Sequence, residues 1–165
     1  RMSIKVDVTV SFSPELKKAL EDIKKPIDRD TAEKVGEDIV DDMKRLIATG
    51  QSPIRGNGRF PAYKDPKKYP GKRKSRSPVN LELTGEFLDD LSSKTISDPA
   101  GYATRVTYDG QKSQDKERGH REGANGQPKR PTIPAASGED FAVSIKTRYT
   151  KTLRDRIIAV LKGKG

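Results

Sequence analysis

The sequence contains no cysteine and a single histidine in 165 residues. Without cysteine, the chain cannot form a disulfide bond, a thiolate nucleophile or a zinc site with cysteine ligands. No apolar run approaches the roughly 18 residues of a membrane span, and the first residues lack the apolar segment of a signal peptide. We therefore expect a protein that is indifferent to redox conditions, makes no membrane contact and folds in a cytoplasm.

The residues that usually carry catalysis are sparse. His120 lies in a polar stretch, with no serine, cysteine or second histidine at a spacing typical of a triad or a metal site. A surface or subunit-interface role is expected for it. The acidic pairs Asp41-Asp42 and Asp89-Asp90 stand beside apolar helical positions, which favours solvated helix faces over acid/base or metal sites. No Walker-type phosphate loop occurs, and we predict no enzyme activity, metal or cofactor.

The chain is strongly basic, with 34 Lys and Arg residues against 24 Asp and Glu and a formal net charge of +10. Such a charge attracts polyanions through long-range electrostatics. Assembly proteins can also be basic because the surfaces on which they dock are acidic, and complementary charges fix the register of docking. A nucleic acid, an acidic protein surface and a solvated basic surface without a specific ligand all stay open at this point.

The length suits one domain with one modest core, which we place over residues 1–165. Strict alternation of apolar and polar side chains from Ile4 to Phe12 predicts a half-buried strand. A short helix follows this strand and ends at Pro26. The predicted fold class is α+β, a small antiparallel sheet packed against two long helices and a short one, with long loops.

The two long helices are predicted from apolar residues at spacings of three and four. The first runs from Thr31 to Thr49, capped by Thr31 or the aspartate before it. Gly50 stands where a left-handed residue ends many helices. The second has apolar residues at helical spacing from Phe141 to Val160 and ends at Gly163.

A short helix is predicted over 84–91, with the threonine at its start as N-cap. Two extended runs follow, at 93–97 and 103–108. Between them, residues 98–101 have the sequence Asp-Pro-Ala-Gly, whose residue types are typical of a turn. The two runs are therefore predicted to form an antiparallel hairpin.

Two long loops complete the prediction, an extended basic loop at 50–80 and a second loop at 109–138. Proline and glycine forbid regular structure over most of the first loop. Between Arg55 and Arg76 it carries nine Lys or Arg residues against one acid, with three aromatic residues interleaved. Loops of this length are uncommon in compact domains unless they are functional or disordered. Binding of nucleic acid through cations and stacked rings is one use, and docking on a neighbouring subunit or an acidic ring is the favoured one.

Three blocks, taken in order, resemble structural proteins of tailed phages: 50–63, 77–85 and 120–134. In the tail-completion and virion-morphogenesis families, a helix precedes a loop that ends in a segment similar to 83–88. A strand hairpin follows, and then a His-x-x-Gly loop and an Arg-Pro-x-Ile-Pro turn precede a C-terminal helix. His120 begins the loop here and Arg130 begins the turn. The resemblance spans about residues 30–162, and it rests on order and spacing.

The sequence departs from the common pattern of these families in two ways. An aromatic residue often follows the Arg-Pro pair, where Thr132 stands here, and the basic loop is long. The first departure leaves the subfamily open. The second leaves open whether the loop faces DNA, the tail tube or the head.

The resemblance implies an α+β subunit without turnover that forms a ring at the virion neck or upper tail, after assembly in the host cytoplasm. The implied partners are copies of the chain, with a hexamer as the expected ring, and a tail terminator or tube and a head-side connector. Transient contact with DNA in the channel is also implied. The predicted interface residues are Arg55, Arg59, Phe60, Tyr63, Tyr69, Lys72, Arg73, His120, Arg121, Arg130 and Ile133. The alternative prediction is a nucleic-acid-binding protein that uses residues 55–76.

Overall fold

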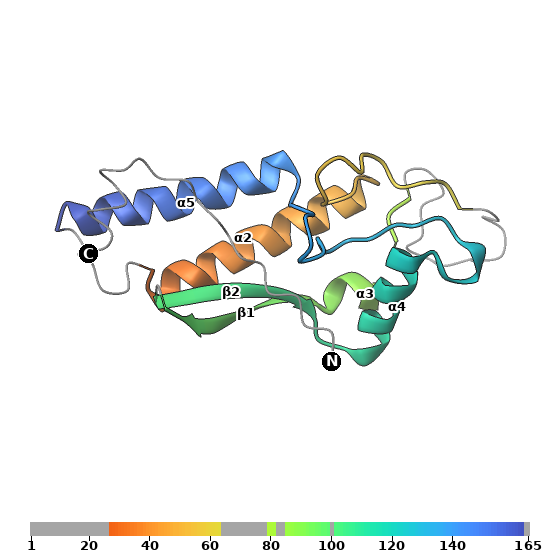
Figure 1. The fold of residues 1–165 in the computed structure, drawn as a ribbon, viewed down its shortest axis with the longest axis horizontal. Helices are drawn as coiled ribbons and strands as arrows, with labels where there is room; N and C mark the ends of the chain where they lie inside the picture. Colours follow the sequence, from red (N-terminus) through yellow and green to blue (C-terminus); the bar gives the residue numbers. More distant parts are fainter. Residues whose placement is uncertain (1–26, 64–78, 82–84, 100, 164–165) are drawn as a thin grey trace.

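The computed structural model describes residues 27–63, 79–81, 85–99 and 101–163 (Figure 1). The predicted strand at 4–12, the short helix after it and the expected cap at residue 84 lie outside the described residues. The same holds for Tyr69, Lys72 and Arg73 of the basic loop. The elements in chain order are α2 (Arg29–Ala48), α3 (Glu86–Asp89), β1 (Leu91–Asp98), β2 (Gly101–Tyr108), α4 (Gln111–Glu122), the 3-10 turn η2 (Ala124–Gly126) and α5 (Val143–Leu161).

Helix α2 confirms the first predicted long helix, although it begins earlier than expected. Its N-cap is Asp28, whose side chain accepts a hydrogen bond from the backbone N–H of Thr31 at 2.8 Å. The predicted cap was therefore wrong, because an acceptor two residues further upstream satisfies the free N–H groups of the first turn. Gly50 follows the helix with a φ of 76°, the left-handed conformation that the sequence predicted. Ile39 and Met43 on the apolar stripe are fully buried.

Strands β1 and β2 form the predicted antiparallel hairpin, which is in register from the pair Leu91 and Tyr108 to the pair Asp98 and Gly101. Helix α2 packs on both strands, and α5 packs on α2, so that α2 lies between the hairpin and α5 (Figure 1). Helix α5 confirms the second predicted long helix. The described chain is thus α+β, with a two-stranded antiparallel sheet and several helices.

The contact between α2 and α5 is fixed by two buried carboxylates. Asp38 is 4% exposed and Asp42 is 2% exposed, and each accepts a hydrogen bond of 2.8 Å from the guanidinium of Arg148 on α5. Removing Arg148 would leave the two buried carboxylates with the cations of their own helix, Lys34 for Asp38 and Arg45 for Asp42, and the loss of a partner by a buried charge is costly. The prediction of a solvated acidic face holds for Asp41, which is exposed, and is wrong for Asp42.

The predicted loop at 109–138 contains a helix, α4, so that part of the loop prediction is wrong. The helix begins after Gly110 and ends at Gly123, whose φ of 71° makes it a left-handed C-cap. Its sequence consists mostly of polar residues, so it lacks the apolar stripe from which a helix is usually predicted. The buried residues of α4 are Ser113 and Glu117. Good helix formers at most positions stabilise such a helix without hydrophobic periodicity.

The short helix is also shorter than predicted. Helix α3 covers only Glu86–Asp89, with Gly85 as N-cap at a φ of 94°. Leu91, the predicted last residue of the helix, instead begins β1 and pairs with Tyr108. The backbone groups of Leu91 are satisfied by hydrogen bonds of the hairpin. These bonds stabilise the chain more than an extension of α3 by one turn would.

Candidate interaction groove and the buried Glu117 cluster

The structure separates the described residues of the predicted interface by burial. Arg55 and Arg59 are exposed, Tyr63, His120 and Arg121 are half-buried, and Phe60, Arg130 and Ile133 are buried. Phe60 is 7% exposed and Ile133 is 4% exposed, and both belong to the hydrophobic core. The chain's own core therefore covers these two side chains as the chain is folded here, and their role as anchors on a neighbour stays a prediction.

Glu117 on α4 is the centre of a buried polar cluster. Its carboxylate accepts hydrogen bonds from the backbone N–H of Thr132 at 3.0 Å, from the hydroxyl of Thr132 at 2.5 Å and from the backbone N–H of Ile133 at 3.3 Å. The phenol of Tyr108 shares a hydrogen bond of 2.7 Å with the same threonine hydroxyl. The cluster therefore attaches the segment after α4 to both α4 and β2.

The ionisation of Glu117 is perturbed by this environment. Burial raises its pKa above the ordinary value, and the hydrogen bonds from Thr132 and Ile133, with the nearby guanidinium of Arg121, oppose this only in part. Arg121 also donates to the backbone carbonyl of Ile133 and to Glu139. Perturbed carboxylates often mark functional sites, but structural networks perturb them as well. Here the oxygens bind the chain's own backbone, which makes Glu117 a structural acceptor.

Arg130 connects a second pair of segments. Its Nε donates to the carbonyl of Pro61 at 2.8 Å, and Nη2 donates to the carbonyl of Ala62 at 2.7 Å. The guanidinium carbon lies 4.9 Å from the ring centroid of Tyr63. The backbone N–H of Arg130 donates to the carbonyl of His120 at 2.8 Å. One side chain and its own backbone therefore join the segment after α2 to the end of α4.

Replacing Arg130 with lysine is expected to lower the free energy of unfolding by about 1 to 2 kcal/mol. Lysine offers a point charge in place of a planar fork, so it cannot reproduce two directed bonds to carbonyls together with the stacking on Tyr63. Urea unfolding followed by circular dichroism measures the change. Arg118→Lys, the same change at an exposed position of α4, is the matched control and should stay within about 0.5 kcal/mol of the starting protein. Equal effects of the two changes would contradict the role given to Arg130.

His120 is on the inner side of α4 and not in the polar loop that was predicted. Its ring centroid lies 5.7 Å from that of Phe87. Burial, together with the positive charges of Lys116 and Arg130, lowers the pKa of His120 to about 4. The imidazole is therefore neutral at neutral pH and contributes to packing within the chain.

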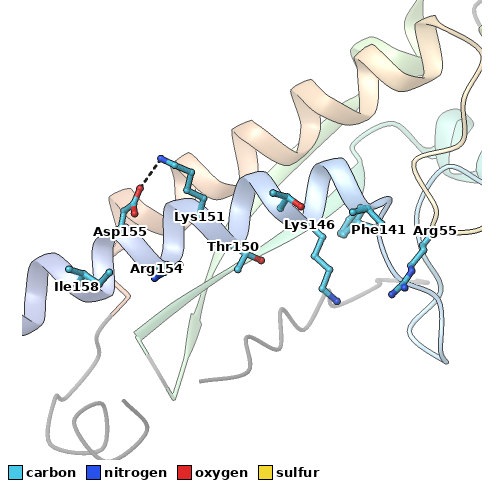
Figure 2. Close-up of a pocket in the computed structure, with 10 residues that line it drawn as sticks. Arg55, Phe141, Lys146, Thr150, Lys151, Arg154, Asp155 and Ile158 are labelled. Atoms are coloured by element: carbon cyan, nitrogen blue, oxygen red, sulfur yellow. Dashed lines mark hydrogen bonds and ion pairs between the residues drawn. The ribbon is translucent and has the colours of Figure 1, made fainter. Parts of the chain in front are cut away.

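A groove of about 720 Å³ lies along α5 (Figure 2). Its lining residues are Arg55, Phe141, Val143, Lys146, Thr147, Thr150, Lys151, Arg154, Asp155 and Ile158. The lining residues that belong to α5 (Val143–Leu161) lie on a face of this helix distinct from the one that contacts α2, where Arg148 and Thr152 meet Asp38. Among these lining residues, Lys and Arg outnumber acids by four to one. The groove is therefore cationic.

Backbone hydrogen bonds place Arg55 at one end of the groove. The N–H of Arg55 donates to the carbonyl of Asp140 at 2.9 Å, and the N–H of Ala142 donates to the carbonyl of Pro53 at 2.7 Å. Figure 2 shows the side chains of Arg55 and Lys146 extending to the same side of α5. Burial alone would raise the pKa of Asp140, but its hydrogen bond with Lys146 and other favourable contacts outweigh burial and lower the pKa.

The cations of the groove are not equally available to a partner. Lys146 is paired with Asp140, and Lys151 lies 3.0 Å from Asp155 in an exposed ion pair. Arg154 is exposed and makes no ion pair within the described ranges. Val143 adds apolar surface, since 63% of it is exposed. The groove thus suits an anionic partner that also presents some apolar surface.

Sequence reasoning found Arg55 but missed the rest of the groove and the Glu117 cluster. The cations of α5 stand at polar positions of an amphipathic helix, where solvated side chains are ordinary. Glu117 has no local signal, because its hydrogen-bond donors lie 15 and 16 residues further along the chain.

Within the part of the chain that the structure describes, no group of three or more His, Cys, Asp or Glu side chains could hold a metal ion. In the same residues, no helix has the length and apolar character needed to span a bilayer. Comparison of the chain with models of protein families, with curated proteins and with solved structures finds no match.

Proposed function

We propose that the chain is a non-enzymatic structural subunit of a tailed-phage virion that acts in a ring at the neck or upper tail, as a tail-completion or head-to-tail joining protein. The observation that carries this proposal is that the sequence blocks behind the phage resemblance pack on one another. Arg130 of the third block binds the carbonyls of Pro61 and Ala62 in the first. The hydroxyl of Ser52 in the first block donates to the carbonyl of Pro131 in the third at 3.4 Å.

The second block takes part in the same packing. Val79 and Leu81 are buried in the core cluster that also contains Phe60 and Ile133. Residues that are far apart in the sequence therefore meet in one end of the molecule, where they make core contacts and bind backbone carbonyls. Residues of the three blocks therefore stabilise the fold. This role supports a structural subunit.

The subunit still needs a surface for its neighbours, because the predicted anchors Phe60 and Ile133 are internal. The cationic groove on α5 supplies such a surface, with Arg55 as the predicted interface residue that lines it. In this proposal, the partners are further copies of the chain and neighbouring neck and tail proteins. The exposed Arg59 follows the groove residue Arg55 closely in the chain and adds to the positive charge.

A second candidate function is binding of nucleic acid through this positive charge. The observation that favours it is the groove itself, where Arg55 and Arg154 are exposed cations. Neutralisation of phosphates by such cations releases counterions, so the affinity would fall steeply with salt. Docking of an assembly protein on one specific surface predicts no such affinity for random duplex DNA.

The test is the solution mass of the purified chain by light scattering, with and without short duplex DNA, at low and moderate salt. We expect a defined ring, or a monomer that ignores DNA once the salt is moderate and that assembles only with its neck partners. A monomer that binds DNA with a strong salt dependence would overturn the structural proposal and put nucleic-acid binding first.

A further inference from the structure

Helix α2 carries a row of exposed acidic residues. Glu33, Glu37 and Asp41 follow one another at a spacing of four, and all three are exposed. This spacing puts them on one face of the helix. The contact with α5 uses other acids of the same helix, Asp38 and Asp42. We call Glu33, Glu37 and Asp41 the acidic row.

The groove on α5 has two cations at the same spacing, with a threonine between them. Lys146, Thr150 and Arg154 are also four residues apart and line the groove together. A helix rises 1.5 Å per residue, so this row and the acidic row of α2 are each about 12 Å long. Two helical rows of equal length can lie side by side, so that Lys146 and Arg154 each face an acidic residue of the other row.

The two rows cannot meet within one chain. Arg148 on α5 holds Asp38 and Asp42 on α2, which fixes the faces through which the helices touch. The acidic row and the groove lie on other faces of these helices. Any pairing between them therefore has to join two separate molecules.

We infer that the cationic groove on α5 of one copy binds the acidic row on α2 of a second copy. The inference rests on the proposed function, because it names the contact through which the ring would close. The two surfaces differ, so the contact is heterologous and runs head to tail, which closes into a ring when the rotation between copies permits.

The charges favour this occupant over a nucleic acid. The groove combines exposed cations with the apolar side chains of Val143 and Ile158. Among the lining residues that the structure describes, no exposed aromatic ring is present for stacking on bases. Each exposed ion pair contributes little by itself, and the existing pair between Glu33 and Arg29 is of this weak kind. Charge complementarity would therefore set partner and register, and the association would weaken with salt.

The experiment uses two variants, each of which changes the charge of one surface. Glu37→Lys with Asp41→Lys makes the α2 row positive, and Thr147→Glu with Arg154→Glu makes the groove more negative. None of these four side chains makes an ion pair within the described ranges, so the fold should tolerate both variants. Alone, the α2 variant places like charges across the contact and the groove variant removes the net positive charge of the groove, so each should self-associate about tenfold more weakly. Mixed in equal amounts, the two variants should associate again. In an alternating ring, the unchanged groove of one variant meets the unchanged acidic row of the other, and the added glutamates of the changed groove meet the added lysines of the changed row.

The control is Lys112→Glu with Lys129→Glu, which reverses exposed charges outside both surfaces and should leave self-association unchanged. Sedimentation over a range of protein concentrations and at two salt concentrations gives the association constants.

Unchanged association of both variants would overturn the assigned contact while leaving the ring proposal intact. A starting protein that stays monomeric at all concentrations would overturn the contact as well, and its behaviour with DNA would then decide the proposed function separately. Capture of duplex DNA by the groove, lost in the Thr147→Glu and Arg154→Glu variant, would replace this contact by nucleic-acid binding.

Discussion

Gly36→Ala is expected to lower the free energy of unfolding by about 2 to 3 kcal/mol, although alanine favours helices over glycine by about 1 kcal/mol. A Cβ atom at this position of α2 would lie 2.4 Å from the hydroxyl oxygen of Thr104 on β2. It would also lie 2.6 Å from the hydroxyl oxygen of Ser93 on β1 and 2.7 Å from its Cβ. The last of these atoms is attached directly to the strand, so the hairpin itself would have to move.

Gly119→Ala on α4 is the matched control for this change. Its new Cβ would meet only the Cβ of Ala124, at an ordinary contact distance of 3.8 Å. The gain in helix propensity is then unopposed, and we expect stabilisation by about 0.5 to 1 kcal/mol. Urea unfolding of both variants measures the difference. Shifts of the same sign would show that Gly36 does not set the distance between α2 and the hairpin.

The sequence predicted those elements whose pattern reflects a single buried face. Helices α2 and α5 have apolar residues at spacings of three and four, and the hairpin has a turn sequence between two extended runs. Helix α4 was not predicted, because its mostly polar sequence resembles that of a loop. The cap of α2 was placed wrongly because several acids and a threonine near residue 30 are equally good caps, and only the backbone selects Asp28.

The candidate site was harder to predict, because its residues become neighbours only through tertiary contacts. Phe60 and Ile133 stand among prolines and charges, which made them look like anchors of exposed loops. In the fold these loops cover the end of α2, and the two apolar side chains enter the core. Arg55 was assigned to an interaction surface from its basic surroundings, yet its neighbour Lys146 lies 91 residues away in sequence. No local pattern connects the two residues.

Glu117→Ala is expected to destabilise the protein by about 3 to 4 kcal/mol, the largest effect that we predict for a polar residue. The change removes the acceptor for the buried N–H groups of Thr132 and Ile133 and for the hydroxyl of Thr132. Donors left buried without an acceptor carry their full cost of desolvation. Glu122→Ala, at an exposed position of the same helix, is the control and should change stability by no more than about 0.5 kcal/mol. Equal effects would contradict the role of Glu117.

Glu117→Gln separates hydrogen bonding from charge at the same position. The amide oxygen can accept from the two backbone N–H groups, and the amide nitrogen can donate to the hydroxyl of Thr132, which then donates to the phenol of Tyr108. We therefore expect glutamine to stay within about 1 kcal/mol of the starting protein at neutral pH. A loss as large as that of the alanine variant would show that the negative charge itself is needed.

The pH dependence of the glutamine variant gives a further test of the same cluster. Because burial raises the pKa of Glu117 in the folded chain, the folded state binds a proton more tightly than the unfolded state does. The stability linked to this proton is fully present below the ordinary glutamate pKa and is lost as the pH rises through the raised value. Glutamine does not titrate, so the stability of the glutamine variant relative to the starting protein should increase over this window and level off above it.

The carboxylates with lowered pKa values, such as Asp28 and Asp109, are present in both proteins and cancel in the difference. Urea unfolding of both proteins between about pH 4 and 8 measures this difference, and a difference that does not change with pH would mean that Glu117 is not desolvated in the folded protein.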